Sequence, residues 1–258
     1  DLNDAMCPSW KATRERTHSP KGRASLMREW LRLQEQSGVD VLAVEQEPQS
    51  FWKGLWKKRA SKQDPQATPD FSHEVYDAMS GCLACKSCVG QCPIKVNIPE
   101  LRSRFLGLYH RRYARPVRDY LIASLEYSMP YLSKMPWLYN GMLRQKWVQG
   151  IMEKRIGMTD SPLFSSMDFA KVLQQWNVRP ATPLALTALT AEERARSVIL
   201  VQDVFTRYFE TPVLAALIEL ASRLGYQVWL APLNPNGKPL HVQGFRKAFA
   251  KAAIHNTR

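Results

Sequence analysis

Four cysteines lie within eleven residues of this 258-residue chain, in the run Cys82-Leu-Ala-Cys85-Lys-Ser-Cys88-Val-Gly-Gln-Cys92-Pro93. Deprotonated thiols bind metals, and thiols also serve as redox groups. The spacing is C-x2-C-x2-C-x3-C-P, and it favours metal binding at one small, compact site. Sulfurs two residues apart can converge on such a site only if the backbone curls around it. We expect Gly81 and Gly90 to permit that curl, and Pro93 to turn the chain away afterwards.

This run is the one described for bacterial ferredoxins, in which three cysteines bind one iron–sulfur cluster and the fourth binds another. It predicts a [4Fe–4S] cluster with Cys82, Cys85 and Cys88 as ligands. Zinc is the main competitor, but structural zinc sites pair two C-x2-C units, or one such unit with two histidines, across a longer spacer. The next histidine after the run is His110, inside a predicted helix. A redox disulfide, or four merely structural cysteines, would not explain the spacing.

The remaining cysteine, Cys7, is followed by a proline and so repeats the Cys-Pro ending of the run. If Cys7 closes an earlier motif, it would join Cys82, Cys85 and Cys88 on one cluster. Cys92 would then bind a cluster together with cysteines that this chain lacks. Two alternatives stay open: Cys7 has no metal-binding role, or all four cysteines from Cys82 to Cys92 serve a single cluster.

The charge balance is strongly basic, with 36 Lys and Arg against 23 Asp and Glu and a formal net charge of +13. Such a balance favours an anionic partner, which includes nucleic acid, a membrane surface, an acidic protein or an anionic cofactor. The basic residues are scattered, and no stacking motif or recognition helix appears. We therefore expect no nucleic-acid binding, and a zinc or iron–sulfur module that binds nucleic acid remains the alternative.

The cysteine usage indicates a metal site in a reducing compartment, because a secreted disulfide framework would distribute its cysteines along the chain. The chain opens without a basic segment followed by an apolar one, and it contains no apolar run long enough to span a membrane. We expect a cytoplasmic protein, with peripheral association at the inner membrane as the alternative.

Helices must position these cysteines. Leu26, Trp30 and Leu33 predict a helix from Arg23 to Gln36, and residues 39–69 have the composition of a long exposed connection. A short helix from about Asp70 to Ser80 should lead into the cysteine run. The helices predicted after the run cover residues 99–113, 116–133 and 137–156, and Pro116 and Pro136 mark the starts of the last two.

The pattern changes in the last third of the chain. Residues 158–196 are rich in Pro, Thr and Ser and are predicted to be a linker. Val198–Val201 predicts a buried parallel strand, and a helix, a second strand at Val228–Leu230 and a last helix at Val242–Ala253 follow. This β-α-β-α order is the start of a doubly wound α/β domain. Two strands do not make a stable open sheet, so we expect the domain to continue beyond this chain.

A resemblance to a known family rests on three segments, namely Met6-Cys7-Pro8-Ser9-Trp10, Arg14-Glu15-Arg16-Thr17-His18-Ser19-Pro20-Lys21-Gly22-Arg23-Ala24 and the cysteine run. Together they resemble the iron–sulfur portion of large bacterial FAD-linked oxidases, in particular dehydrogenases of the D-2-hydroxyglutarate type. The iron–sulfur subunit of glycolate oxidase is a more distant relative. The likeness covers essentially the whole chain and implies a piece of the C-terminal half of such an enzyme.

The resemblance implies that an upstream FAD domain oxidises a D-2-hydroxy acid, and that electrons leave the flavin through iron–sulfur centres to an acceptor that remains unknown. It implies an α-helical ferredoxin-like domain over residues 1–157. Residues 197–258 would start the Cys-rich domain of heterodisulfide-reductase-like proteins. Relatives carry a Cys-Cys-Gly segment near Asn234–Pro239, where this chain has no cysteine. No metal site is therefore expected there, and the segment should serve packing or partner contact.

Some basic residues are candidates for the cofactor environment. Arg14, His18, Lys21 and Arg23 form a basic cluster near Cys7 in sequence, which would stabilise a reduced iron–sulfur cluster or face the flavin site, with Arg23 as the cofactor-binding candidate. The alternative is a solvated loop in which Gly22-Arg23 starts a helix. Lys86, inside the run, is predicted to tune the reduction potential through its charge.

No flavin site or general base can be recognised in the sequence, so the catalytic residues are unassigned. We expect the chain alone to be inactive toward the hydroxy acid and the full-length enzyme to be a homo-oligomer. A purely structural role, in which a cluster staples a helical domain, is a further alternative.

Overall fold

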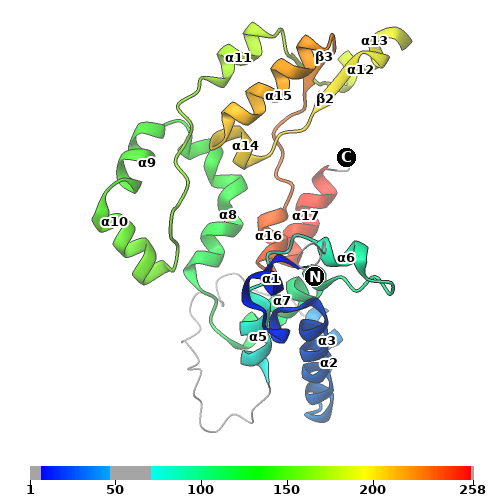
Figure 1. The fold of residues 1–258 in the computed structure, drawn as a ribbon, viewed down its shortest axis with the longest axis vertical. Coiled ribbons are helices and arrows are strands. Elements are labelled where there is room, and N and C mark those ends of the chain that lie inside the picture. The colour runs from blue at the N-terminus through cyan, green and yellow to red at the C-terminus, as the bar shows by residue number, and fades with distance from the viewer. Residues whose placement is uncertain (1–6, 47–70, 257–258) are drawn as a thin grey trace. The chain divides into compact units, whose positions relative to one another are not determined.

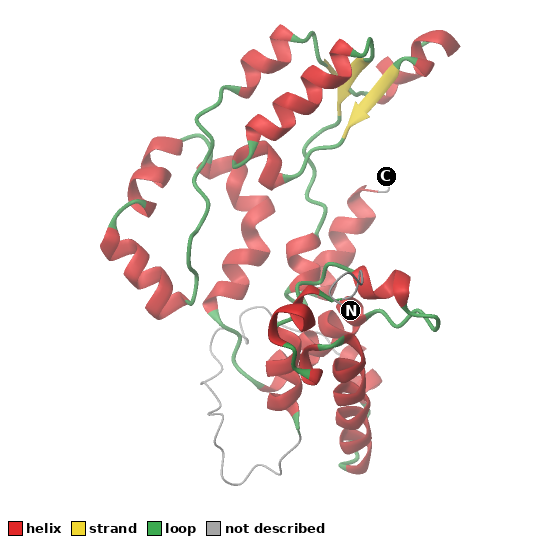
Figure 2. Cartoon of the chain, viewed as in Figure 1, coloured by secondary structure: helices red, strands yellow, loops and turns green. Residues whose placement is uncertain are grey.

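The computed structural model describes residues 7–46 and 71–256, and these are mostly helical with one small parallel sheet (Figures 1 and 2). The chain divides into two compact units. The first contains residues up to Ala123 together with Lys238–Ala250, and the second contains Ser124–Gly237 together with the residues after Ala250. The boundaries of these units differ from those predicted at residues 157 and 197. The first unit ends at Ala123, and the chain returns to it after Gly237.

The first unit is helical. Its elements are α1 (Pro8–Thr13), the 3-10 turn η1 (Arg16–His18), α2 (Pro20–Gln36), α3 (Val41–Gln46), α5 (Ser72–Ser80), α6 (Ser87–Gln91), α7 (Ile98–Arg112), the first part of α8 (Val117–Leu132), α16 (Lys238–Val242) and the first part of α17 (Arg246–Asn256). The helices predicted at 23–36, 70–80 and 99–113 are confirmed. The predicted connection at 39–69 begins with α3, and the rest of it lies outside the described residues.

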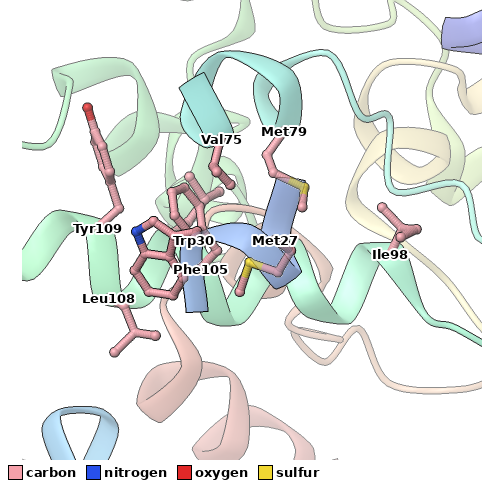
Figure 3. Close-up of a cluster of buried hydrophobic side chains, with 9 residues drawn as sticks. Met27, Trp30, Val75, Met79, Ile98, Phe105, Leu108 and Tyr109 are labelled. Carbon is pink, nitrogen blue, oxygen red and sulfur yellow. The ribbon is translucent and has the colours of Figure 1, made fainter. Parts of the chain in front are cut away.

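A hydrophobic core holds the helix that leads into the cysteine run. Met27 and Trp30 of α2 pack with Val75 and Met79 of α5 and with Phe105 of α7 (Figure 3). The rings of Trp30 and Phe105 meet edge to face at 5.1 Å. The indole nitrogen of Trp30 donates a hydrogen bond of 2.9 Å to the Ser72 hydroxyl at the start of α5, so this buried polar group is satisfied.

The last predicted helix, Val242–Ala253, is instead split into α16 and α17. Gly244 lies between them with φ at +73°, a conformation that L-residues rarely adopt. A β-carbon at this position would lie 2.8 Å from Cβ of Leu106, so the glycine also allows a close approach to α7.

The second unit carries the sheet. Its elements are the rest of α8, α9 (Pro136–Leu143), α10 (Lys146–Ile151), the π-helical turn η2 (Met152–Ile156), α11 (Phe169–Gln175), β1 (Arg179–Pro180), α12 (Pro183–Thr187), α13 (Ala191–Ala195), β2 (Ser197–Leu200), α14 (Val204–Tyr208), α15 (Thr211–Arg223), β3 (Gln227–Leu230) and the end of α17. The single helix predicted at 137–156 is therefore two helices and a π-turn. The predicted linker contains three helices and one strand.

The three strands are parallel in the order β1-β3-β2. β3 is central, with Val228 and Trp229 buried, and α15 packs on it through Leu214 and Ile218. The prediction of a parallel strand near residues 198–201 is confirmed, but the prediction of its burial is wrong. β2 is an edge strand, and Ile199 is 50% exposed. A continuous apolar run does not distinguish a central strand from an edge strand whose outer side lacks a neighbour.

Candidate metal centre

Four cysteines from two distant parts of the sequence line one cavity in the first unit. Cys7 precedes α1, Cys82 and Cys85 follow α5, and Cys88 lies in α6. Cys7 is 9% exposed, whereas Cys85 is exposed. The fifth cysteine, Cys92, is half-buried at the end of α6 and does not line this cavity. The structure thus groups the thiols as three from the run plus Cys7.

The backbone between the cysteines curls through left-handed residues. Ala84 has φ at 51° and Lys86 has φ at 63°, so both neighbours of Cys85 adopt a conformation that is costly for L-residues. The side chain of Ala84 is buried in spite of this backbone conformation, with 1% exposure. The expectation that Gly81 and Gly90 permit the curl is wrong, since Gly81 has φ at −76° and Gly90 lies within α6.

Gly81 lies beside side chains from the start of the chain, and a β-carbon there would fit. A β-carbon there would lie 3.4 Å from a guanidinium nitrogen of Arg23 and 3.6 Å from the Ser9 hydroxyl. Both distances are close to van der Waals contact.

The segment Ser19-Pro20-Lys21-Gly22-Arg23 starts α2 and delivers Arg23 to the cavity. The Ser19 hydroxyl accepts a hydrogen bond of 2.9 Å from the Gly22 amide and caps the helix, and Pro20 occupies a first-turn position where its missing N–H costs nothing. A β-carbon on Gly22 would lie 1.9 Å from the Arg16 carbonyl oxygen. Only glycine fits this turn without movement of the backbone.

Arg23 is the most deeply buried charged residue beside the cysteines, with 1% exposure. Its Nε donates to the Ala78 carbonyl at 2.8 Å, one terminal nitrogen donates to the Ser9 hydroxyl at 2.9 Å, and the other lies 3.5 Å from the sulfur of Cys7. Among the described residues, no carboxylate forms an ion pair with Arg23. A buried cation is costly unless an anion compensates it, so an anionic group in this cavity would complete the site.

Two further cations surround the cysteine loop. Lys238, at the start of α16, donates from its ammonium group to the Ala84 carbonyl at 3.1 Å. Arg102 of α7 is 7% exposed and donates to the Met79 carbonyl at 3.0 Å. Burial lowers the pKa of Arg102, and the Cys82 thiolate acts in the opposite direction. The surroundings of the thiols are therefore electropositive.

The thiols themselves sit in different environments. A hydrogen bond to the Ser87 hydroxyl lowers the pKa of Cys85, and the charge of Lys238 contributes to this. Burial raises the pKa of Cys88, and repulsion from the Cys82 and Cys7 thiolates adds to the increase. The second effect is a consequence of their proximity, because charges interact strongly only over short distances.

The donor set suits a cluster bound by four thiolates. The cavity between the side chains measures about 10 Å³, which is room for about one water molecule. Among residues 7–46 and 71–256, no three His, Cys, Asp or Glu side chains lie close enough to bind one metal ion. The residue types and the uncompensated Arg23 suit the chemistry of an anionic four-thiolate cluster, whereas the distances in this structure are not those of a bound metal.

The other predicted residues divide into two groups. Lys86 is exposed and lines the cavity with Arg23. Arg14 and Lys21 are exposed and do not line it, and Arg14 lies over the Trp10 ring instead. His18 contacts the site through its backbone, because its carbonyl accepts from the Cys7 thiol at 3.7 Å. The predicted basic cluster is thus one buried arginine surrounded by solvated residues.

Sequence reasoning missed Lys238 and Arg102. Lys238 lies within Asn234–Pro239, where packing or partner contact is expected, and nothing in its sequence neighbourhood indicates the cysteine loop. A larger cavity, of about 350 Å³, lies in the second unit between α10 and the segment that follows η2, and none of the predicted site residues lines it.

Comparison with known proteins places the chain in a family. It is 62% identical over 257 residues to a protein named D-2-hydroxyglutarate dehydrogenase from Pseudomonas putida, a match that covers 99% of this chain and 26% of that protein. Proteins of the same name from Escherichia coli and Haemophilus influenzae are 47% and 38% identical, each over 98% of this chain and 25% of their own length. The chain belongs to the D-2-hydroxyglutarate dehydrogenase family.

The chain spans about a quarter of the length of the D-2-hydroxyglutarate dehydrogenases that it matches. No protein-family model and no solved structure matches it. Among the described residues, no helix combines the length and the apolar character needed to cross a membrane.

Proposed function

We propose that this chain is the iron–sulfur electron-transfer portion of an FAD-dependent dehydrogenase for D-2-hydroxy acids of the D-2-hydroxyglutarate type. Cys7, Cys82, Cys85 and Cys88 would bind a [4Fe–4S] cluster. The observation that carries the proposal is that Cys7 lines the same cavity as the three cysteines of the run, beside a buried arginine that has no carboxylate partner among the described residues. Cys92 would bind elsewhere.

The electrostatics support electron transfer as well as binding. When bound, a four-thiolate cluster supplies one-electron chemistry and carries negative charge, which increases on reduction. Arg23 and Arg102 are buried close to the thiols, and Lys238 donates a hydrogen bond to the backbone of the cysteine loop at Ala84. These cations would stabilise the reduced form and raise the reduction potential.

The loop is open on its outer side, which suits a group that must exchange electrons. Cys85 and Lys86 are exposed, and Leu83 is 68% exposed. An electron donor or acceptor could approach the loop there without a conformational change. The flavin would be the donor, and the acceptor is unknown.

The flavin and the hydroxy-acid site would belong to the part of the dehydrogenase that this chain does not span. The family name supports a dehydrogenase role, and the cysteine cavity would supply only its electron-transfer step. On this proposal the chain alone does not oxidise D-2-hydroxyglutarate, and the complete cytoplasmic enzyme does.

Anaerobic reconstitution with iron and sulfide, compared across cysteine variants, tests the proposal. The wild-type chain should take up about four iron and four sulfide ions and show broad visible absorbance that dithionite bleaches. Cys7→Ser, Cys82→Ser, Cys85→Ser and Cys88→Ser should each reduce the iron content and change the spectrum of the reduced cluster. Cys92→Ser is the matched control and should keep the wild-type iron content and the wild-type spectrum of the reduced cluster.

Two results would overturn the proposal. A colourless chain that binds zinc stoichiometrically would replace iron–sulfur chemistry with a structural zinc site. A cluster that Cys92→Ser abolishes and Cys7→Ser leaves unchanged would assign all four ligands to the run itself.

A further inference from the structure

The helices α9 and α10 of the second unit are half-buried in part and carry several large apolar side chains that are exposed. In α9, Tyr139 packs on Phe164 at a ring distance of 4.5 Å, and Asn140 forms hydrogen bonds with the backbone of Phe164. α9 also carries Trp137, which is 71% exposed, and Met142, which is 53% exposed. Single exposed apolar side chains are common, but a contiguous group of them marks an interaction site.

The pattern repeats in α10 and η2, which follow α9 along the chain (Figure 1). Val148 and Met152 are half-buried on one side. Trp147 is 67% exposed and Ile151 is 47% exposed, and they share one side of the helix because they lie four residues apart. We call the exposed residues of the two helices the Trp surface; its members are Trp137, Leu138, Met142, Trp147 and Ile151.

The charges in the segment that carries the Trp surface have one dominant sign. Residues 131–156 contain five basic side chains and one acidic side chain, Glu153. The five are Lys134, Arg144, Lys146, Lys154 and Arg155, and all of them are exposed. Tyr131, which is 72% exposed, lies under the ammonium group of Lys134.

We propose that the Trp surface binds an anionic phospholipid membrane. Tryptophan and tyrosine favour the headgroup region, aliphatic side chains enter the acyl boundary, and lysine and arginine attract anionic lipids. The cores of protein interfaces are depleted in lysine, and three of the five cations here are lysines. The helices are short and would lie on the membrane surface.

Vesicle flotation of the full 258-residue chain tests this inference. Vesicles of phosphatidylcholine with phosphatidylglycerol should carry the chain upward, and vesicles of phosphatidylcholine alone should not. The double variant Trp137→Ser/Trp147→Ser should bind about tenfold more weakly or worse. The double variant Lys146→Glu/Lys154→Glu should bind the anionic vesicles more weakly by a similar factor, and added salt should weaken wild-type binding.

Matched controls lie elsewhere on the second unit. Leu184→Ser removes an apolar side chain that is 83% exposed, and Lys171→Glu reverses a charge on α11. Both should bind vesicles like the wild type. Circular dichroism should show that every variant keeps its helices, and the charge variants remain informative if a tryptophan variant does not fold.

The inference is overturned if the wild type does not float with anionic vesicles, or if both double variants float as well as the wild type does. It is also overturned if Trp137→Ser/Trp147→Ser converts a dimer of the chain to a monomer without any vesicle binding, because a second copy would then cover this surface. None of these outcomes depends on whether the cysteines bind a cluster.

Discussion

A terminal guanidinium nitrogen of Arg23 lies 3.5 Å from the sulfur of Cys7. The arginine is 1% exposed and among the described residues has no carboxylate partner, so a thiolate or a thiolate-bound cluster is the anion best placed to compensate it. This contact joins the start of α2 to the cysteine cavity. The contact therefore depends on the conformation of the segment before α2, which places Arg23 in the cavity.

Replacement of Arg23 by methionine should make the reduction potential of the reconstituted cluster more negative. The buried positive charge stabilises the reduced, more anionic form, and methionine keeps much of the volume without the charge. A redox titration followed by electron paramagnetic resonance measures the potential. Arg14→Met removes an exposed charge and should leave the potential unchanged.

If the Arg23→Met chain does not assemble a cluster, Arg23→Lys keeps the charge and should restore assembly. An Arg23→Met cluster with the wild-type potential would show that this arginine serves packing alone.

Lys238→Met should also lower the potential, and by less than Arg23→Met does. The ammonium group of Lys238 binds the Ala84 carbonyl at 3.1 Å on the partly exposed loop, where solvent screens its charge. Lys251→Met, on an exposed position of α17, is the control for the loss of one positive charge. Equal potentials for the two variants would mean that Lys238 acts only through the overall charge of the chain.

Gly22→Ala should reduce the free energy of unfolding by about 1–3 kcal/mol, because the new β-carbon would lie 1.9 Å from a backbone oxygen that cannot move freely. Gly90→Ala is a matched control inside a helix, where the added carbon meets nothing within 4 Å. It should be neutral or stabilise by up to about 1 kcal/mol. Urea unfolding of the two variants measures the difference, and a Gly22→Ala chain as stable as Gly90→Ala would contradict the close approach.

Acid should destabilise the first unit through His110. Burial, together with the positive charge of Arg115, lowers the pKa of His110 from 6.5 to about 3. Between these values the unfolded chain binds a proton that the folded chain does not. The stability that the folded chain gains from a neutral His110 is therefore complete above pH 6.5. It is lost as the pH falls toward 3, by at most about 1.4 kcal/mol in the free energy of unfolding per pH unit.

The groups that face His110 limit this effect. Its Nε2 lies 3.6 Å from a carboxylate oxygen of Asp119, and the Tyr76 and Tyr109 rings pack against it. Burial raises the pKa of Asp119, which acts in the opposite direction as that carboxylate takes up a proton. His110→Gln should flatten the dependence of the unfolding free energy on pH below 6.5, and His255→Gln, at an exposed position, should not. Equal slopes for the two variants would show that other groups control acid stability.

Local features of the fold could be read from the sequence. The helix predicted from Arg23 to Gln36 forms, although α2 begins three residues earlier, at Pro20 behind a Ser19 cap. Gly225, with φ at +84°, follows α15 as a local stop signal. The failures are not local. β2 was expected to be buried and is an edge strand, because among the described residues it pairs with β3 alone. β3 is central because β1, a two-residue strand inside the predicted linker, pairs with its other side.

The sequence by itself determined the thiol chemistry, because the spacing from Cys82 to Cys92 favours a curled backbone with converging sulfurs whatever the rest of the chain does. Only the tertiary structure decided which thiols share a cavity. Cys7 joins Cys82, Cys85 and Cys88, and Cys92 does not, because α2 and η1 pack against α5 and α1 packs on η1. The burial of Arg23 and the position of Lys238 beside the cysteine loop depend on packing between distant segments, which no local pattern encodes.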